Sequence, residues 1–370
     1  MMKNENKKTI KVLHIVGSMH PGGMENFVMN IYENIDREKY HFDFAEHAIK
    51  ENGYDDRIRE LGGKVFLLPR LTKNPVKSLK DLKKIIHDEK YDIVIRHTPN
   101  ALIAPQLMMA KKEGAITVCH SHNTTDPKKF LHIIGKILLK KCVDVRLACS
   151  ESAGKWMFGN QNYEVVKNAI DINKFAYNKD AADKVVAEFN LHGRHIYGHV
   201  ANFIESKNHG FLLEIFKEIT KLDERAVLIC LGDGSTRLQI ETKIRDLGLE
   251  DKVILTGIRK DVEAFMSAFE VMIFPSFFEG LPLTLIEAQI SGLPICMSDT
   301  ITDEVIITEN LVTKYSIEKP AIDWAKKVIK MREENKPRIC QIDNVRKNGY
   351  DLKLMVSWYQ QFLSKLVEEK

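Results

Sequence analysis

Residues 271–290 read VMIFPSFFEGLPLTLIEAQI, and this stretch decides the class of fold. The apolar run at 271–275 has the length and composition of a buried β-strand. After a loop, the leucine-rich pattern at 283–291 predicts a helix, whose start tolerates Pro282 because proline lacks an N–H that would need a partner. A buried strand followed directly by a helix is half of a β–α–β unit, which is the building block of parallel sheets.

The same alternation extends from this stretch to both ends of the chain. In the first half, strands are predicted at 10–16, 41–47, 64–68, 92–97, 116–121 and 145–149, with helices at 24–34, 76–87 and 101–113. In the second half, the further strands are 196–202, 226–231, 252–256 and 294–297, with helices at 208–221, 235–247 and 261–267. Two such series predict an α/β protein with two Rossmann-like, doubly wound domains.

A chain of 370 residues is long enough for two such domains. We place the first at 1–172 and the second at 173–351, because Lys167–Phe175, which leads into a polar segment at 177–184, reads as the linker. A C-terminal helix at 352–370 is expected to pack back onto the first domain. Doubly wound domains bind ligands outside the carboxyl ends of their strands, so we expect the site in a cleft where the two domains face each other.

The composition is that of a protein from a reducing compartment. The six cysteines contain no Cys-x-x-Cys pair, which argues against a zinc site or a disulfide framework; they are Cys119, Cys142, Cys149, Cys230, Cys296 and Cys340. No apolar run approaches the roughly 20 residues of a membrane-spanning helix, and the N-terminus lacks the apolar segment of a signal peptide. We therefore expect a cytoplasmic protein.

The charge is unevenly spread. Residues 1–170 hold 28 Lys/Arg and 20 Asp/Glu, a net charge of +8, whereas residues 171–370 hold 27 and 31, a net charge of −4. A basic first half and an acidic second half suggest that the first half meets an anionic surface. Chance variation of surface composition explains the charges equally well.

The loop that follows 271–275 carries two carboxylates, Glu279 before the predicted helix and Glu287 one turn into it. The first N–H groups of a helix have no partner inside it, so the amides of Leu283 and Thr284 are available to phosphate oxygens. A carboxylate such as Glu287 suits a vicinal diol such as ribose, and Glu279 suits sugar hydroxyls. A single glutamate in the first turn of a helix is also explained by its favourable interaction with the helix dipole.

Three further strand ends carry polar or glycine-rich segments. Gly17–Glu25 pairs two glycines with a helix start, which lets a ligand approach the backbone, although a tight turn explains it as well. Ile204–His209 places Lys207 before a helix, where a mobile point charge suits a diphosphate; a solvated lysine is the alternative. His120–Asn123 offers two histidines on one side of a strand, of which His122 is favoured for sugar contact over a purely structural role. We find no further His, Cys or Asp set that completes a metal site.

These motifs together resemble glycosyltransferase family 4, and within it the bacterial capsule and exopolysaccharide transferases. The resemblance covers nearly the whole chain, and EGLPLTLIE is its most specific segment. The segments are GGME (22–25), HSHN (120–123), NAID…F (168–175), ESKNH (205–209), LGDG (231–234), LTGIRKDV (255–262) and EGLPLTLIE (279–287). The family implies a GT-B fold, retention of configuration and no metal or other cofactor, with the nucleotide-sugar as a substrate.

The resemblance also implies roles for individual residues. Glu279, His122 and Lys207 would be catalytic, with Glu279 and His122 beside the transferred sugar. Lys207 and the amides of Leu283 and Thr284 would hold the diphosphate, and Glu287 the ribose. The residues that would line the donor are Gly22, Gly23, Asn202, Gly257, Ile258, Arg259, Gly280 and Leu281.

One position departs from the family pattern. Asn202 stands where the family places an arginine shortly before the phosphate lysine. Losing a forked cation weakens stabilisation of the leaving group by about 2 kcal/mol or more unless another group replaces it. Arg259, in a neighbouring loop, is a candidate replacement.

We expect a retaining, metal-independent hexosyl- or N-acetylhexosaminyl-transferase that uses a UDP-sugar and a polyprenyl-diphosphate-linked saccharide, with no nucleic acid among its partners. Two alternatives stay open. A nucleotide-sugar 2-epimerase has the same fold but needs acid and base groups around C2. A non-catalytic subunit of a membrane complex needs no nucleotide.

Segment 127–142 is a basic amphipathic pattern. Phe130, Leu131, Ile134, Ile137, Leu138 and Cys142 follow helical spacing, and around them stand Lys128, Lys129, Lys136, Lys140 and Lys141. Such helices suit anionic lipid surfaces. Packing on the sheet is the alternative, and both hold if the apolar residues face inward and the lysines face lipid. We expect the protein to associate peripherally with the inner face of the cell membrane.

Overall fold

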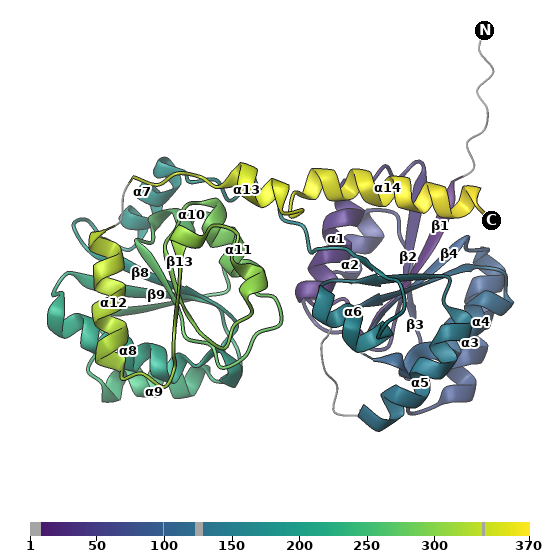
Figure 1. The fold of residues 1–370 in the computed structure, drawn as a ribbon, viewed down its shortest axis with the longest axis horizontal. Helices are drawn as coiled ribbons and strands as arrows, with labels where there is room; N and C mark the ends of the chain where they lie inside the picture. The colour runs from purple at the N-terminus through teal and green to yellow at the C-terminus, as the bar shows by residue number, and fades with distance from the viewer. Residues whose placement is uncertain (1–8, 99, 123–128, 335–336) are drawn as a thin grey trace, which may run out of the picture. The chain divides into compact units, whose positions relative to one another are not determined.

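The computed structural model describes residues 9–98, 100–122, 129–334 and 337–370 (Figure 1). The chain forms two compact units. The first comprises Met1–Ala169 together with Gly349–Lys370, and the second comprises Ile170–Asn348. Each unit has its own parallel sheet and its own core.

The first unit is built on a parallel sheet with the order β3-β2-β1-β4-β5-β6-β7. Its strands are β1 (Ile10–Ile15), β2 (Tyr40–Glu46), β3 (Val65–Leu67), β4 (Ile93–Thr98), β5 (Ile116–Ser121), β6 (Val145–Ala148) and β7 (Glu164–Val165). The order reverses direction between β1 and β4, so the loops that leave these two strands diverge at the carboxyl edge of the sheet.

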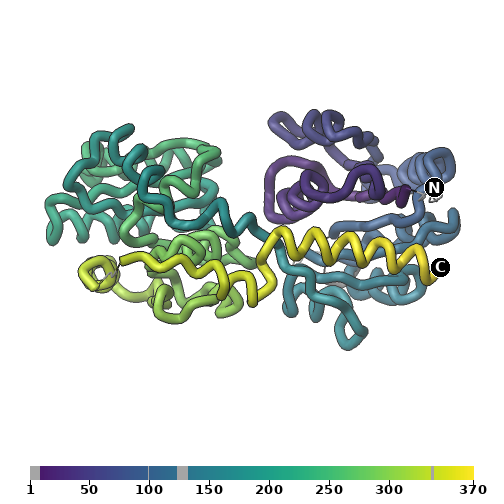
Figure 2. Tube along the Cα trace, turned by 90° about the horizontal axis from the view of Figure 1, so that it is seen from above, coloured from purple at the N-terminus to yellow at the C-terminus, as the bar shows by residue number. Residues whose placement is uncertain are grey.

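Helices cover both faces of this sheet. One face packs against α1 (Gly23–Asn34), α2 (Asp55–Glu60) and α14 (Leu352–Glu368), through a core that includes Phe27, Ile58 and Tyr359. The other face packs against α3 (Pro75–Glu89), α4 (Ala104–Lys112), α5 (Lys129–Cys142) and α6 (Glu151–Phe158), and the short helix η1 (Ala101–Ile103) precedes α4. Figures 1 and 2 show α14, the end of the chain, lying along α1.

The second unit has a parallel sheet with the order β10-β9-β8-β11-β12-β13. Its strands are β8 (His195–Val200), β9 (Ala226–Leu231), β10 (Val253–Gly257), β11 (Val271–Phe274), β12 (Ile295–Ser298) and β13 (Val312–Tyr315). β8 and β11 are neighbours although two strands separate them in the chain, so the order reverses between them. The loops that follow β8 and β11 therefore meet at the switch point of this sheet.

The helices of the second unit also lie on two faces (Figure 1). One face carries α8 (His209–Leu222), α9 (Arg237–Asp246) and α12 (Ala321–Glu333). The other carries α7 (Lys179–Glu188), α10 (Val262–Ala268), α11 (Leu283–Ile290) and α13 (Ile342–Lys347). Short turns of helix stand at η2 (Glu205–Lys207), η3 (Asp303–Val305) and η4 (Glu309–Leu311).

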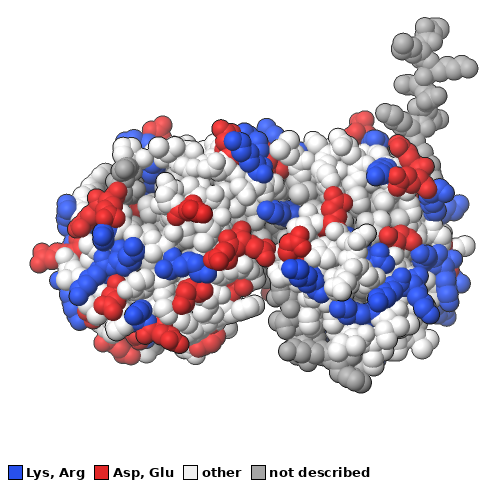
Figure 3. Space-filling view, in the orientation of Figure 1, with Lys and Arg blue, Asp and Glu red and all other residues white. Residues whose placement is uncertain are grey.

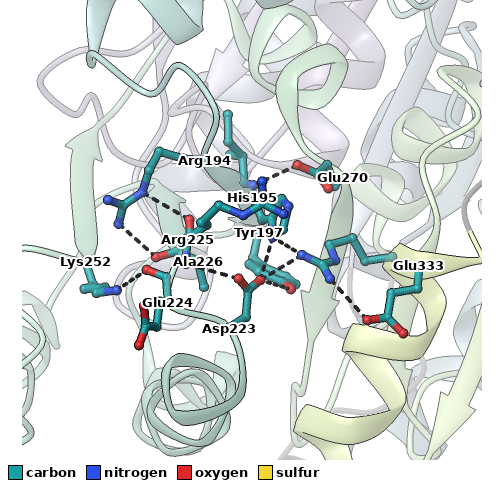
Figure 4. A network of polar contacts seen from close by, with 12 residues as sticks. Arg194, His195, Tyr197, Asp223, Glu224, Arg225, Ala226, Lys252, Glu270 and Glu333 are labelled. Atoms are coloured by element: carbon teal, nitrogen blue, oxygen red, sulfur yellow. Dashed lines mark hydrogen bonds and ion pairs between the residues drawn. The ribbon is translucent and has the colours of Figure 1, made fainter.

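The amino edge of the second sheet is held by a polar cluster around Asp223 (Figure 4). Its carboxylate accepts hydrogen bonds from His195 Nδ1 at 2.8 Å, from the Tyr197 hydroxyl at 3.2 Å and from Arg332 Nη1 at 2.8 Å. The cluster joins β8, α8 and α12 at the edge opposite the one where ligands of such folds bind. We assign it to stability.

The predicted fold class is confirmed, with differences in detail. The sequence missed β7 and β13, which are an edge strand of two residues and an edge strand whose residues are all half-buried. The linker expected at Lys167–Phe175 contains the boundary between the units, which follows Ala169 rather than residue 172. The polar segment 177–184 after it contains the start of α7, whose N-terminus is capped by the Asn178 side chain. Ala182 and Val185 are buried, so helix packing outweighs the polar composition.

Candidate functional site

The strongest candidate site lies at the carboxyl edge of the second sheet, where the loops after β8 and β11 meet. The loop after β8 contains η2 and ends in Lys207, and the loop after β11 contains Glu279 and leads into α11. Both loops are the ones that the sequence singled out. Two neighbouring parallel strands explain why residues 72 positions apart come together.

Lys207 and Glu279 form a direct ion pair. Lys207 Nζ lies 2.5 Å from Glu279 Oε2, and the two side chains are only 17% and 7% exposed. The other carboxylate oxygen, Glu279 Oε1, is buried and has no hydrogen-bond partner in the part of the chain that the structure describes. The two charges thus neutralise each other, and one carboxylate oxygen is left as an unused acceptor. A buried acceptor without a partner costs free energy unless a ligand hydroxyl donates a hydrogen bond to it.

Backbone contacts fix the register of the two loops. The N–H of Phe277 donates to the carbonyl of Ser206 at 2.8 Å, and the Asn208 side-chain amide donates to the carbonyl of Pro275 at 3.1 Å. Asn208 itself adopts a left-handed conformation with φ of 55°, which asparagine tolerates better than most residues. These contacts set the position of Lys207 relative to Glu279 independently of the ion pair.

The helix α11 begins directly after this loop. Pro282 is its N-cap, and no side chain caps the helix with a hydrogen bond, so the amides of Leu283 and Thr284 at the helix start remain available for an anion. Gly280 and Leu281 lead into this turn. A Cβ added at Gly280 would have open space around it, and its φ is not positive, so the glycine leaves room in the loop rather than relieving backbone strain.

Glu287 follows one turn into α11, as predicted. Burial is the main cause that raises its pKa to about 7, with Glu263 adding to the rise and Lys174 opposing it. Lys174 also pairs with Glu263 at 3.4 Å. A half-buried carboxyl group in a poorly hydrated setting is suited to binding a hydroxyl-rich ligand. Sequence reasoning missed its neighbour Lys174, which lies more than 100 residues away in the chain.

The loop after β10 leaves the same edge of the sheet, with β9 between β10 and β8. Gly257 has a φ of 71°, and its carbonyl accepts the N–H of Gly232 at 2.9 Å. Ile258 is 83% exposed, which is unusual for isoleucine and leaves its backbone accessible. Gly232 is needed for packing, because a Cβ there would lie 1.9 Å from the carbonyl oxygen of Ala201.

Arg259 is engaged elsewhere, which bears on its suggested role. Its guanidinium donates to Glu188 through two nitrogens, at 2.9 and 3.1 Å, and to Asp261 at 2.9 and 2.8 Å. Asn202, the position of the missing arginine, is exposed at the end of β8. In this arrangement the Arg259 guanidinium is paired inside the protein, and Lys207 is the other cation among the predicted donor residues of this unit.

Gly22, Gly23 and His122 belong to the first unit. Gly22 is the N-cap of α1 and is extended, with φ of −169°, so neither glycine relieves a left-handed turn. A Cβ at Gly22 would lie 2.6 Å from the carboxylate of Glu25, whereas one at Gly23 would meet only the Asn168 amide at 3.8 Å. Gly23 therefore leaves space at a helix start that no side chain caps.

His122 stands just beyond β5, and its neighbours were not foreseen. His122 Nε2 lies 3.0 Å from His97 Nδ1, and His97 Nε2 lies 3.0 Å from His14 Nδ1. His120 lies beside them, with its ring centroid 4.0 Å from that of His122. The predicted absence of a further histidine to complete a metal-ligand set is wrong, because His97 is the register partner of His120 on the neighbouring strand. Asn123 lies outside the described residues.

Comparison with known proteins agrees with this architecture. The model of Glycosyltransferase Family 4 matches residues 21–174, and that of Glycosyl transferases group 1 matches residues 183–348. EpsF of Bacillus subtilis strain 168, named as a glycosyltransferase, is 34% identical over 365 residues, covering 94% of each chain. The chain belongs to glycosyltransferase family 4.

Other relatives of this glycosyltransferase are more distant. It is 27% identical over 351 residues, 87% of each chain, to the UDP-Gal:α-D-GlcNAc-diphosphoundecaprenol α-1,3-galactosyltransferase of Escherichia coli. Among solved structures, Anabaena HepE in complex with UDP matches with a TM-score of 0.80 and 16% identity, covering 96% of this chain and 100% of that one. WaaG matches with a TM-score of 0.72 and 13% identity, covering 95% and 99%. These likenesses show that the glycosyltransferase has the GT-B fold.

Proposed function

We propose that this glycosyltransferase transfers a hexosyl or N-acetylhexosaminyl group, with retention, from a UDP-sugar to a polyprenyl-diphosphate-linked saccharide in capsule or exopolysaccharide synthesis. The observation that carries the proposal is the Lys207–Glu279 ion pair beside the uncapped start of α11. The donor class is supported by HepE, which was crystallised with UDP and with UDP-glucose. The acceptor class is supported by the name of the E. coli relative.

The donor binds by exchanging contacts with that ion pair. The diphosphate attracts Lys207 and accepts the N–H groups of Leu283 and Thr284, while Glu287 accepts hydroxyls of the ribose. Glu279 is then released toward the sugar, whose hydroxyls reach its free oxygen, Oε1. Each step replaces a charge contact inside the protein by one with the substrate, so binding need not leave a buried charge unpaired.

The chemical step needs no covalent enzyme intermediate. As the bond between the sugar and the diphosphate breaks, negative charge develops on the leaving phosphate, and Lys207 with the α11 amides stabilises it. The acceptor hydroxyl attacks from the same face and gives its proton to the leaving phosphate oxygen. His122, in the first unit, is proposed to contact the sugar near this bond as a neutral imidazole, because burial lowers its pKa to about 3.

A screen of nucleotides by thermal shift tests the donor class. UDP and UDP-sugars are expected to raise the melting temperature in a concentration-dependent way, by mass action, and more than GDP or ADP. NMR of the sugar product with a lipid-diphosphate acceptor then tests retention. Conversion of UDP-GlcNAc to its 2-epimer without acceptor would point instead to an epimerase, and a protein that binds no nucleotide would not be a transferase of this kind.

We also propose that transfer requires no divalent metal. Lys207 and helix amides supply the positive charge that Mg²⁺ or Mn²⁺ supplies in other transferases. Initial rates are therefore expected to be unchanged when Mg²⁺ and Mn²⁺ are omitted from the assay. Activity that disappears and returns on adding Mg²⁺ or Mn²⁺ would refute this point while leaving the donor class intact.

Helix α5 supports a membrane contact, in a different form from the one expected. Gly135 packs so closely on η1 that an added Cβ would lie 2.5 Å from the carbonyl oxygen of Ala101, and Leu139 and Cys142 are buried beside it. We expected the apolar residues of this helix to face inward. That expectation is wrong for the side of α5 that points away from η1. There Ile133, Ile134, Ile137 and Leu138 are 60%, 47%, 61% and 39% exposed.

Basic residues surround this apolar stripe. Exposed lysines lie on α3, α4 and α5, which pack side by side: Lys77, Lys80, Lys83, Lys84, Lys111, Lys112, Lys140 and Lys141. Figure 3 shows Lys and Arg gathered at the edge of the first unit where α3 and α4 lie. Lys128 and the side chains of Lys129, Phe130 and Leu131 lie outside the described residues. No helix among the described residues is both long and apolar enough to cross a bilayer.

Vesicle sedimentation separates the contributions of the stripe and the lysines. Changing Lys136, Lys140 and Lys141 to Gln is expected to weaken binding to anionic vesicles about fivefold per exposed lysine, because each contributes about 1 kcal/mol near the headgroups. Changing Ile133, Ile134 and Ile137 to Ser is expected to reduce binding to all vesicles, and high salt to mimic only the first change.

The control variant changes exposed lysines of the second unit, Lys184, Lys221 and Lys326, to Gln, and is expected to bind vesicles normally. If all three variants bind vesicles as strongly as the unmodified protein, or if none of the four proteins binds, α5 does not contact the membrane.

A further inference from the structure

Four histidines share one face of the first sheet. His97 and His120 are register partners on β4 and β5, and His122 follows two residues later, so its side chain leaves the same face. His14 on β1 is opposite Ile95, two residues before His97, and therefore also lies on that face. The ring contacts agree, since the centroids of His14 and His97 are 5.3 Å apart and those of His97 and His120 are also 5.3 Å apart.

His120 is the anomalous member of this cluster. It is fully buried, and neither Nδ1 nor Nε2 has a hydrogen-bond partner among the residues that the structure describes. A neutral imidazole carries one N–H donor and one acceptor, and buried polar groups of this kind are normally paired. Phe27 covers the ring edge-on at a centroid distance of 5.2 Å and offers it no polar partner. Within the described ranges, no side chain hydrogen-bonds to either nitrogen of His120.

One ring nitrogen from each of His97, His120 and His122 lies within 4.8 Å of the other two. The ligand nitrogens of a tetrahedral zinc site stand about 3.3 Å apart, given Zn–N distances of about 2.0–2.1 Å. His97 Nδ1 and His122 Nε2 are already 3.0 Å apart, so small ring rotations suffice for these two. We propose that His97, His120 and His122 form a three-imidazole site for a transition-metal ion of the Zn²⁺ class.

His14 fits the role of an outer partner. When His97 Nδ1 binds the ion, its Nε2 carries the proton and donates to His14 Nδ1 across the observed 3.0 Å contact. Histidine ligands commonly donate their second nitrogen in this way, which fixes the tautomer and the ring orientation. His122, the only ligand of the three that is not fully enclosed, leaves one side of the ion open for water or an anion.

The ligand chemistry selects the ion. Three nitrogen donors without a carboxylate suit Zn²⁺, Co²⁺, Ni²⁺ or Cu²⁺, whereas Mg²⁺, Ca²⁺ and Mn²⁺ prefer oxygen. Arg96 and Cys119 neighbour His97 and His120 in sequence but face α4, on the opposite side of the sheet, so no thiolate belongs to the set.

Zinc competition with a chromophoric chelator tests the site in the metal-free full chain under a phosphine reductant. We expect one equivalent to bind. His97→Gln and His120→Gln should each weaken affinity by at least about 100-fold, and His14→Gln by about 10- to 100-fold, as for outer-shell partners. Co²⁺ should give the d–d spectrum of a tetrahedral nitrogen site without thiolate charge transfer. Mg²⁺ should not compete.

His209→Gln is the matched control, because His209 is a buried histidine of the second unit whose two ring nitrogens also lack partners. It should retain the full affinity. Equal loss in this variant, unchanged stoichiometry after His97→Gln, or no binding of one equivalent would overturn the proposal. If His120→Gln does not fold, His122→Gln, at the open side, takes its place. The test measures binding alone, so its outcome is independent of the proposed transferase activity.

Discussion

Replacing Lys207 by methionine is expected to lower kcat/KM by about 10²- to 10³-fold, the cost of removing one group that stabilises developing charge. The loss should be at the upper end here, because Asn202 offers no second cation and Arg259 is tied to Glu188 and Asp261. The carboxylate of Glu279, 7% exposed, would also lose its partner. Initial rates with saturating and limiting UDP-sugar measure the effect.

The contact between Lys207 and Glu279 predicts how two changes combine. The double variant Lys207→Met/Glu279→Gln is expected to lose less activity than the product of the two single losses, since each single change leaves an unpaired buried charge. Lys260→Met, a change at an exposed lysine of the same unit, serves as the control and should be near wild type. A Lys207→Met variant within threefold of wild type would remove this lysine from the site.

Donor affinity is expected to rise with pH through about 7. Glu287 has a pKa near that value, and only its ionised form accepts two ribose hydroxyls. Below the pKa, binding then requires loss of a proton, and Kd for UDP-glucose should fall by up to about tenfold per pH unit. UDP-glucose is the suitable ligand, because its diphosphate does not titrate in this range. Calorimetry between pH 5.5 and 8.5 measures the profile.

Variants around Glu287 should move this profile in opposite directions. Glu287→Gln is expected to bind weakly and without this pH dependence. Glu263→Gln removes a negative charge that raises the pKa of Glu287 and should shift the rise to lower pH, whereas Lys174→Met should shift it to higher pH. A profile that persists unchanged in Glu287→Gln would assign the titration to another group.

The same shift has a defined effect on stability. The folded-state pKa of Glu287 lies above its ordinary value of 4.5, so the folded protein holds a proton that the unfolded chain releases. Its contribution to the free energy of unfolding is therefore greatest below pH 4.5 and is lost as the pH rises toward 7. Binding of the donor, which favours the ionised form, offsets this loss.

Local periodicity sufficed for most of the fold, because buried strands and amphipathic helices each leave a pattern within a short window. It failed where context decides. β13 is an edge strand with no buried residue. Helix α7 buries only Ala182 and Val185, and the rest of its sequence is mostly polar. For α5, the pattern did not show which side of the helix packs on the protein. The close packing of Gly135 on Ala101 shows that the side with Gly135 faces inward.

The site was predictable where its residues follow strand ends. Lys207, Glu279 and Glu287 were found because parallel strands bring their carboxyl ends to one edge. The histidine cluster was missed although His97 also stands at a strand end. Its register with His120 depends on which strands are neighbours, and that order is a long-range property that no local pattern carries. Likewise, the partners of Arg259 were not foreseen, since Glu188 lies 71 positions away in the chain, on α7.

The placement of α14 has a consequence for how the protein is made. The first unit is completed by Gly349–Lys370, whose Tyr359 and Leu363 fill its core beside Phe27. On the ribosome, the sheet of this unit is synthesised first but must wait for the whole second unit to be translated, roughly ten to forty seconds at about 5–20 residues per second. During that interval an apolar surface beside α1 stands open. The second unit, a single continuous segment, is thus the one able to fold first, and the early half of the nascent chain is the one that needs protection by chaperones.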